Sequence, residues 1–72
     1  MPIGKRLKRE LDKRGLSQGQ LALLSGVSRS HISMIIEGKR DATVTVAVKL
    51  AKPLDVSLDY LAGIERPGLM GA

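Results

Sequence analysis

The sequence predicts an all-α domain built from five short helices, and three observations lead to this prediction. The chain has 72 residues, of which 43% are apolar, so a single domain with one compact core accounts for its length. Glycine and serine interrupt it at short intervals, as in helices joined by tight turns. Between these interruptions, apolar residues recur with the helical period. Because Tyr60 is the only aromatic residue, the core is expected to be aliphatic.

The first predicted helix spans residues 3–14. Ile3, Leu7 and Leu11 recur every four positions as a narrow apolar stripe, and Gly15 supplies the left-handed residue that ends a helix. The basic residues of this helix are Lys5, Arg6, Lys8, Arg9, Lys13 and Arg14. A solvated helix face is the ordinary explanation of such a stripe, and contact with the flank of a DNA site is the alternative.

The second predicted helix lies between Ser17 and Gly26. Ser17 and Gln20 have the spacing of a capping box, in which each side chain accepts a hydrogen bond from the other residue's backbone N–H. Gly26 provides the left-handed stop, which makes this helix about two turns long. The residues expected on its inner face are Leu21, Ala22 and Leu24.

The third predicted helix begins after Ser28, a favourable N-cap, and ends at Glu37 before Gly38. Its apolar residues lie on one side at helical spacing, which indicates a buried face. Ile36 is open to two interpretations, as a core residue or as an exposed apolar spot for a partner. The apolar residues of this helix are Ile32, Ile35 and Ile36.

The segment of residues 43–48 is ambiguous because its alternating β-branched residues are compatible with a strand. A lone strand would have no partner in this chain, so we predict a fourth helix from about Thr45 to Leu54. Pro53 removes one backbone donor and is expected to loosen or bend its last turn. The helical apolar stripe consists of positions 44, 47, 48, 50, 51 and 54.

The fifth predicted helix is short, begins after Ser57 and ends before Gly63. Residues 64–72 contain proline and glycine and have no apolar period. We therefore assign residues 1–63 to the domain, and we expect residues 64–72 to be a tail that is flexible or that contacts a dimer partner.

Charge and composition limit the possible functions. Twelve Lys and Arg against seven Asp and Glu give a net charge of +5, a field that attracts nucleic acid or an anionic membrane surface. No apolar run is long enough to span a membrane or resembles a signal peptide, so a cytoplasmic protein is expected. The chain has no cysteine, and His31 alone cannot form a zinc site. Because the pattern lacks paired carboxylates, an activated nucleophile and a phosphate-binding loop, we expect no enzyme and no cofactor.

The second and third predicted helices have the features of a helix-turn-helix pair. Small Ala22 and the reversal at Gly26 suit two helices that cross steeply at close range. Such a pair presents the start of its second helix outward, where short donors and one guanidinium group are suited to base edges in a major groove. The residues at this outward end are Ser28, Arg29, Ser30 and Ser33.

Residues 3–63 resemble the Xre and phage-repressor (lambda repressor-like) family of helix-turn-helix transcription regulators. Each matching fragment alone is weak, but in this order and at these spacings they are highly specific. The resemblance implies a compact five-helix DNA-binding domain whose third helix enters the major groove, usually as a two-fold dimer on a pseudo-palindromic operator. The matching runs are Gly15-Leu16-Ser17-Gln18, Leu21-Ala22, Gly26-Val27-Ser28-Arg29-Ser30, Ile32-Ser33, Gly38-Lys39-Arg40, Leu50-Ala51-Lys52 with Leu54, and Val56-Ser57-Leu58-Asp59-Tyr60-Leu61.

The resemblance also implies roles for individual residues. Those facing bases are Arg29, Ser30, Ser33 and Met34, and those binding phosphate are Gln18, Ser28, Lys39 and Arg40. Three features depart from the family pattern. Met34 replaces a polar or basic residue, so its contact would be apolar, for example with a thymine methyl group. Ile36 and Glu37 stand where the family often has Glu followed by Arg or Asn, and a carboxylate at this usual phosphate-binding position would repel DNA. Pro53 replaces a residue that favours a helix.

The function expected from this reasoning is sequence-specific binding of double-stranded DNA by a repressor-like homodimer, with no small-molecule effector evident. The apolar residues left over after the core is filled place the dimer contact at Tyr60, Leu61 and Ile64. The alternative is a protein-interaction module on the same scaffold, such as an antitoxin or anti-regulator, which Ile36 and Glu37 favour. Salt-dependent binding to random DNA would distinguish the two functions.

Overall fold

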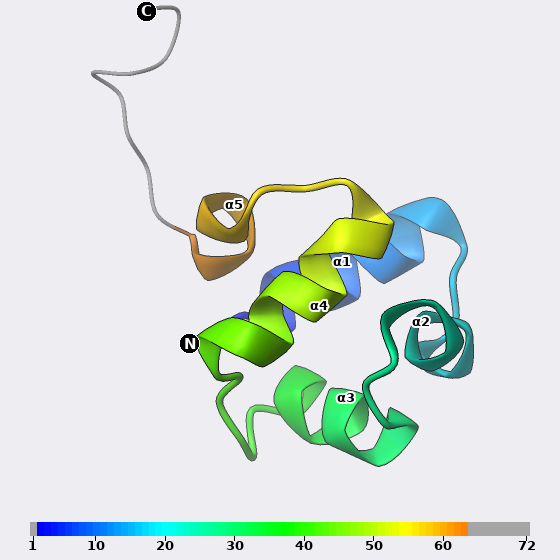
Figure 1. Cartoon of the computed structure of the whole chain (residues 1–72), viewed down its shortest axis with the longest axis horizontal. Helices are drawn as coiled ribbons and strands as arrows, with labels where there is room; N and C mark the ends of the chain where they lie inside the picture. Colours follow the sequence, from blue (N-terminus) through cyan, green and yellow to red (C-terminus); the bar gives the residue numbers. More distant parts are fainter. Residues whose placement is uncertain (1, 64–72) are drawn as a thin grey trace, which may run out of the picture.

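The computed structural model describes residues 2–63 and confirms the all-α prediction. The helices are α1 (Gly4–Arg14), α2 (Gln18–Ser25), α3 (Arg29–Ile36), α4 (Val44–Leu54) and α5 (Leu58–Ala62). In Figure 1, α4 crosses in front of α1 at the centre of the molecule, with α2 and α3 on one side and α5 on the other. α2 packs against α3 and α4, α1 packs against α3 and α5, and α4 also packs against α5. None of the helices within residues 2–63 is long and apolar enough to cross a membrane.

Hydroxyl side chains determine where four of the five helices begin. Each accepts a hydrogen bond from the backbone N–H three residues later, at 3.0–3.2 Å, which satisfies a donor that the helix itself leaves unpaired. The predicted capping box at α2 is confirmed, since Gln20 Oε1 accepts from the Ser17 N–H at 2.8 Å. α4 begins one residue earlier than predicted because Thr43 caps it. The four capping residues are Ser17, Ser28, Thr43 and Ser57.

The end of α4 differs from the other helix ends. Pro53 lies inside the last turn, and the helix continues through it to Leu54, because a missing N–H removes one hydrogen bond without ending the helix there. Asp55 then adopts the left-handed conformation with φ of 53° and donates its N–H to the carbonyl oxygens of Ala51 and Lys52. Aspartate tolerates this conformation better than most residues because its side chain is short and polar.

The buried core is aliphatic, as predicted, and all five helices contribute to it. Each helix buries a narrow stripe of apolar residues. The core therefore lies where the stripes of the five helices meet, and not between any single pair of helices. Ile36, which the sequence left open, is half-buried and packs against this core. The buried apolar residues are Ile3, Leu7, Leu11, Leu21, Val27, Ile32, Ile35, Ala42, Ala47, Leu50, Ala51, Leu54 and Leu61.

Two apolar residues predicted to face inward do not do so. Leu24 in α2 and Val44 in α4 are each 60% exposed. α2 has only eight residues and buries Leu21 alone where it packs against its neighbours, so Leu23 and Leu24 lie on the side away from these contacts. Val44 is the first residue of α4, and the buried stripe of that helix begins only at Ala47. The helical period therefore assigned both residues to the wrong face.

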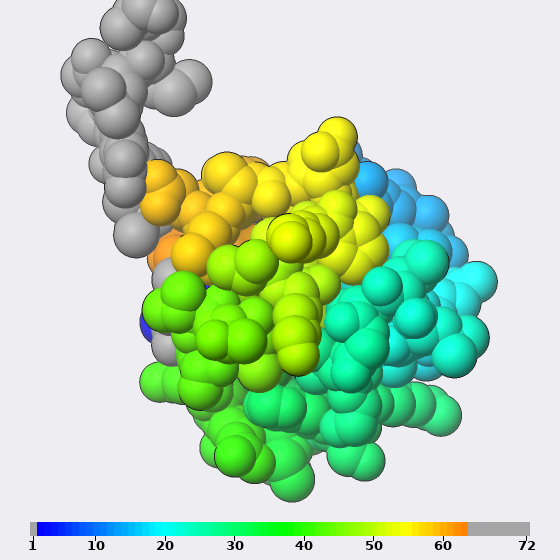
Figure 2. All heavy atoms as spheres, in the orientation of Figure 1, coloured from blue at the N-terminus to red at the C-terminus, as the bar shows by residue number. Residues whose placement is uncertain are grey.

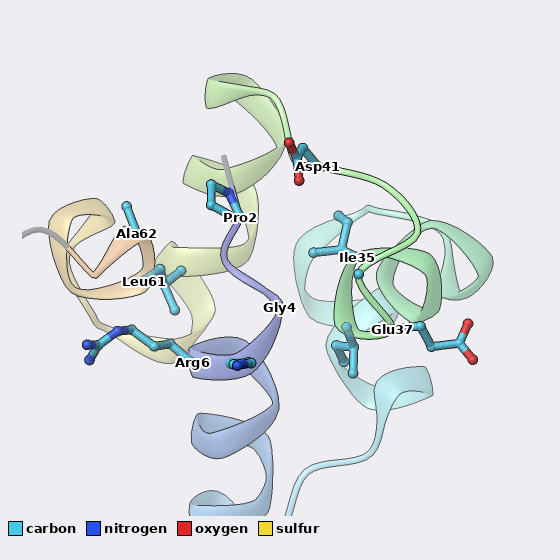
Figure 3. Close-up of a pocket in the computed structure, with 11 residues that line it drawn as sticks. Pro2, Gly4, Arg6, Ile35, Glu37, Asp41, Leu61 and Ala62 are labelled. Carbon is cyan, nitrogen blue, oxygen red and sulfur yellow. The ribbon is translucent and has the colours of Figure 1, made fainter.

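The start of α1 lies directly against the end of α3, and glycine makes this approach possible. A Cβ atom at Gly4 would overlap the carbonyl oxygen of Ile35 and would lie 3.1 Å from that of Ile36. Figure 3 shows Gly4 at the start of α1, beside Ile35 and the end of α3, on the wall of a hollow of about 490 Å³. α1 therefore braces the C-terminal end of α3 through backbone contact.

A polar cluster fastens α5 to the middle of α1. The Glu10 side chain is only 3% exposed, and its carboxylate accepts hydrogen bonds from the Tyr60 hydroxyl at 2.9 Å and from Arg14 Nε at 3.2 Å. The Arg6 guanidinium group lies over the Tyr60 ring, 5.5 Å from its centroid. The Tyr60 hydrogen bond lowers the pKa of Glu10, with smaller contributions from Arg14 and Lys13, although burial opposes the effect.

Candidate nucleic-acid interface

The turn between α2 and α3 is tightly determined. Gly26 has φ of 75° and donates its N–H to the carbonyl oxygen of Ala22, which ends α2 and reverses the chain. Ser25 Oγ accepts from the Val27 N–H at 3.1 Å, and Val27 is buried beneath the turn. These local contacts position α3 against α2, so the predicted helix-turn-helix pair is present.

The predicted base-facing residues lie together on the exposed side of α3. Ile32 and Ile35 are buried on its inner side. Residues 29, 33 and 37 form one i,i+4 row on the opposite side, and residues 30 and 34 form the next row. We call this exposed side the reading face. The residues of the reading face, which together with Lys39 line an open hollow of about 420 Å³, are Arg29, Ser30, Ser33, Met34 and Glu37.

The size of α3 matches the major groove. Eight helical residues extend about 12 Å, and a helix with side chains is about 10–12 Å wide, close to the width of about 12 Å of the groove in B-DNA. Figure 2 shows that α2, α3 and the loop after α3 form one continuous end of the molecule, coloured from teal to green. α3 is therefore at the surface and not covered by the helices of residues 2–63.

The predicted phosphate-binding residues lie at the starts of α2 and α3 and in the loop after α3. Gln18 is the first residue of α2, and Ser28 immediately precedes α3. The Ser28 oxygen accepts the capping hydrogen bond from His31 N–H, which leaves the hydroxyl proton available to donate. Lys39 and Arg40 are both exposed in the loop that follows α3.

The starts of α2 and α3 share an electrostatic property that favours an anion. Neither helix carries an acidic residue in its first turn. The positive end of each helix dipole therefore meets no carboxylate in its own first turn that would compete with a bound anion. Glu37, at the far end of α3, lies with a carboxylate oxygen 3.8 Å from Lys39 Nζ, so a neighbouring cation offsets part of its repulsion toward DNA.

The basic stripe on α1 is partly engaged within the molecule. Arg6 covers the Tyr60 ring, Arg14 binds Glu10, and Lys8 Nζ lies 3.3 Å from the Asp12 carboxylate. The other three basic residues of the stripe, Lys5, Arg9 and Lys13, are exposed. Among residues 2–63, no group of three or more His, Asp or Glu residues is placed to hold a metal ion.

Two of the three residues predicted for the dimer contact lie within the described part of the chain, and only one of them is accessible. Leu61 is completely buried, so its assignment to that contact was wrong: α5 has only five residues and inserts this one into the core. Tyr60 is half-buried, and its hydroxyl is bound to Glu10. Ile64 lies outside the residues that the structure describes.

Sequence reasoning missed two residues that hold the site in place. Glu10 was assigned no role, although it lies three residues after Leu7 and beside Leu11 on the inward side of α1. Gly4 also lies on this side, three residues before Leu7. Extending the helical period to polar residues and glycine would have placed both of them inward.

Comparisons with known proteins agree with this geometry. The helix-turn-helix family matches residues 6–61. The crystal structure of the restriction-modification controller protein C.AhdI from Aeromonas hydrophila is similar, with a TM-score of 0.78 and 37% sequence identity over 83% of this chain and 91% of that chain. No curated protein matches the sequence. The matched residues include the capped pair α2 and α3 and extend over most of the domain, and on this basis the chain belongs to the Xre-like helix-turn-helix family of DNA-binding transcription regulators.

Proposed function

We propose that this protein is a non-enzymatic, repressor-like regulator that inserts α3 into the major groove of a specific double-stranded DNA sequence. The observation that carries the proposal is the reading face, where the exposed residues Arg29 and Ser30 and the half-buried Ser33 offer one guanidinium group and two hydroxyl groups on a helix of the right size. Arg29, Ser30, Ser33 and Met34 would contact bases. A regulator of this kind acts where DNA is found, so the proposal implies a cytoplasmic protein.

Phosphate contacts would fix the orientation of α3 in the groove. The first turns of α2 and α3 contain no acidic residue, and an exposed loop with two cations follows α3. The proposed phosphate-binding residues are Gln18, Ser28, Lys39 and Arg40. Similarity to a restriction-modification controller protein supports a regulator of the controller kind.

The regulator would act as a homodimer. One helix-turn-helix reads only a few base pairs, which is too little information to select an operator among the many competing sites of a genome. Two copies related by a two-fold axis would place their reading faces on half-sites about 34 Å, or roughly 10 base pairs, apart. With Leu61 buried, the accessible part of Tyr60 and Ile64 in the tail of residues 64–72 remain as the proposed contact.

The decisive experiment is selection of bound sequences from a random duplex library by the full chain. We expect a pseudo-palindrome with half-site centres roughly 10 base pairs apart. Binding to random DNA should weaken with salt, with a log–log slope on the order of −4 to −8 for a dimer that contacts a few phosphates on each half-site. A slope near zero together with no enriched sequence would refute DNA binding.

A protein-interaction module is the second candidate, and one structural observation favours it. The consecutive residues Leu23 and Leu24 of α2 are 88% and 60% exposed, and two large exposed apolar side chains on so small a domain are typical of a protein contact. A protein whose main task is to sequester a partner through this surface would bind the partner but would scarcely bind random DNA. The salt-dependence measurement therefore separates the two candidates.

A further inference from the structure

We infer that Met34 and the hollow beside it recognise the methyl group at C5 of a pyrimidine in the major groove, which is present in thymine and in 5-methylcytosine. This inference rests on the proposed function, because it concerns one contact made by the reading face. It identifies the chemical feature that this face selects at one position of the DNA site.

Met34 differs in chemistry from the rest of the reading face. Its side chain is 42% exposed, and it is one of four large apolar side chains exposed among residues 2–63. Its position four residues after Ser30 and five after Arg29 points it away from the buried Ile32 and Ile35. It therefore takes no part in the core, and its apolar surface is available to a partner.

The major groove offers one apolar group to such a side chain. The base edges there present hydrogen-bond donors and acceptors, and the C5-methyl group is the single apolar feature among them. A flexible thioether adapts to an apolar group of irregular position better than a branched side chain does. An exposed methionine on this face thus gains free energy by covering a methyl group and gains none from the polar base edges.

The hollow beside Met34 has room for the edge of a base and carries groups that suit either pyrimidine. Ser30 and Ser33 line it, and a hydroxyl group can donate to O4 of thymine or accept from N4 of cytosine. Glu37 lines it as well, and a carboxylate can accept from N4 of cytosine. These neighbours are compatible with both sources of the methyl group, so the distinction between them is left to the experiment.

The spacing along α3 predicts where in the DNA site the methyl group lies. Five residues separate Arg29 from Met34, which is about 7.5 Å along the helix axis. Successive base pairs are about 3.4 Å apart, so this distance corresponds to roughly two base-pair steps. The methyl-dependent position should lie within about three base pairs of the position whose preference depends on Arg29.

The test uses the full chain and single-position variants of the site selected from the random library. In one series each thymine is replaced by uracil, and in the other each cytosine is replaced by 5-methylcytosine, so that every duplex differs by one methyl group. Burial of one methyl group is worth about 0.8 kcal/mol, or about fourfold in affinity. We expect a fourfold loss with uracil at one position of each half-site if the source is thymine. If the source is 5-methylcytosine, we expect a fourfold gain at one position.

Three variants assign the effect to Met34. Met34→Ala should bind the methylated and unmethylated duplexes equally, and Met34→Leu should keep most of the discrimination because it stays apolar. Leu23→Ala is the matched control, because Leu23 is an exposed apolar residue that does not line the hollow, and it should discriminate as the wild type does. Circular dichroism confirms that each variant is folded.

The remaining outcomes overturn the inference at different levels. The wild type could bind methylated and unmethylated duplexes equally at every position within about three base pairs of the one whose preference depends on Arg29. This result would refute the inference but would not affect the proposed function. Methyl discrimination that persists in Met34→Ala would assign the contact to another residue. The absence of salt-dependent binding to any duplex would overturn the proposed function, and this inference with it.

Discussion

The close approach of α1 to α3 predicts that a substitution which normally stabilises a helix will destabilise this protein. Alanine is favoured over glycine in a helix by about 1 kcal/mol. At residue 4, however, the new Cβ atom would overlap one backbone carbonyl oxygen and lie 3.1 Å from a second, and neither can rotate away. We therefore expect Gly4→Ala to lower the free energy of unfolding by about 1–3 kcal/mol, the usual cost of overpacking.

Gly19 provides a matched control, because it also lies in the first turn of a helix. A Cβ atom there would have its nearest neighbour, Ser17 Oγ, at 3.8 Å, which is an ordinary contact. Gly19→Ala should leave stability unchanged or raise it by up to about 1 kcal/mol. In a domain of this size, 1 kcal/mol corresponds to about 4–8 °C in Tm. Thermal unfolding followed by circular dichroism should therefore separate the two variants clearly.

The difference between these two variants isolates the contact in the folded state. Both substitutions reduce the freedom of the unfolded chain by the same amount, so that contribution cancels when they are compared. A Gly4→Ala protein that is as stable as Gly19→Ala would refute the backbone approach of α1 to α3. Urea unfolding should rank the variants in the same order.

Acid stability, DNA binding and self-association give three more predictions. Because the pKa of Glu10 in the folded protein lies below its ordinary value of 4.5, its contribution to stability is present above that pH and is lost as the pH falls through the folded value. Tyr60→Phe should therefore lower the free energy of unfolding, measured with urea, by about 1.5–3 kcal/mol at neutral pH and by less at acid pH. A loss of stability that does not depend on pH would contradict this role of the Tyr60–Glu10 hydrogen bond. In competition binding, Arg29→Ala should lower the binding free energy by about 1–3 kcal/mol on the selected site and by little on random DNA. Gln18→Ala should weaken binding to both kinds of DNA equally, because a phosphate contact carries no sequence information. If Arg29→Ala also weakened both equally, Arg29 would be a phosphate contact. Ile64→Asp should weaken self-association and operator binding together in sedimentation experiments, with the fold intact, and a wild type that is monomeric at high concentration with and without operator would rule out the dimer.

Local signals in the sequence predicted the helices well. A hydroxyl residue that caps a helix, or a glycine that ends one, acts on backbone groups only a few residues away. Its effect can therefore be predicted from the local sequence without knowledge of the rest of the fold. This is why Ser17, Ser28 and Ser57 were recognised as helix starts and Gly26 as a helix end. The order of these signals also carried the family resemblance.

Features that depend on neighbouring helices could not be predicted in the same way. Whether Leu24 or Leu61 is buried depends on which side of a short helix meets its neighbours, and a two-turn helix has too few residues for the helical period to settle this. The bond between Glu10 and Tyr60 joins residues 50 positions apart. Residues distant in sequence come together only through tertiary packing, and local pattern contains no information about such a pair.

The two contacts of α1 have a mechanical consequence. This helix of 11 residues, about 16 Å long, touches the end of α3 at Gly4 and holds α5 at Glu10. It therefore connects α3, the helix that would enter the groove, with α5, the last helix that the structure describes. In a dimer joined next to α5, the separation of the two reading faces would depend on the two copies of α1. A small change in the position of α5 against α1 would accordingly alter the half-site spacing that such a dimer binds.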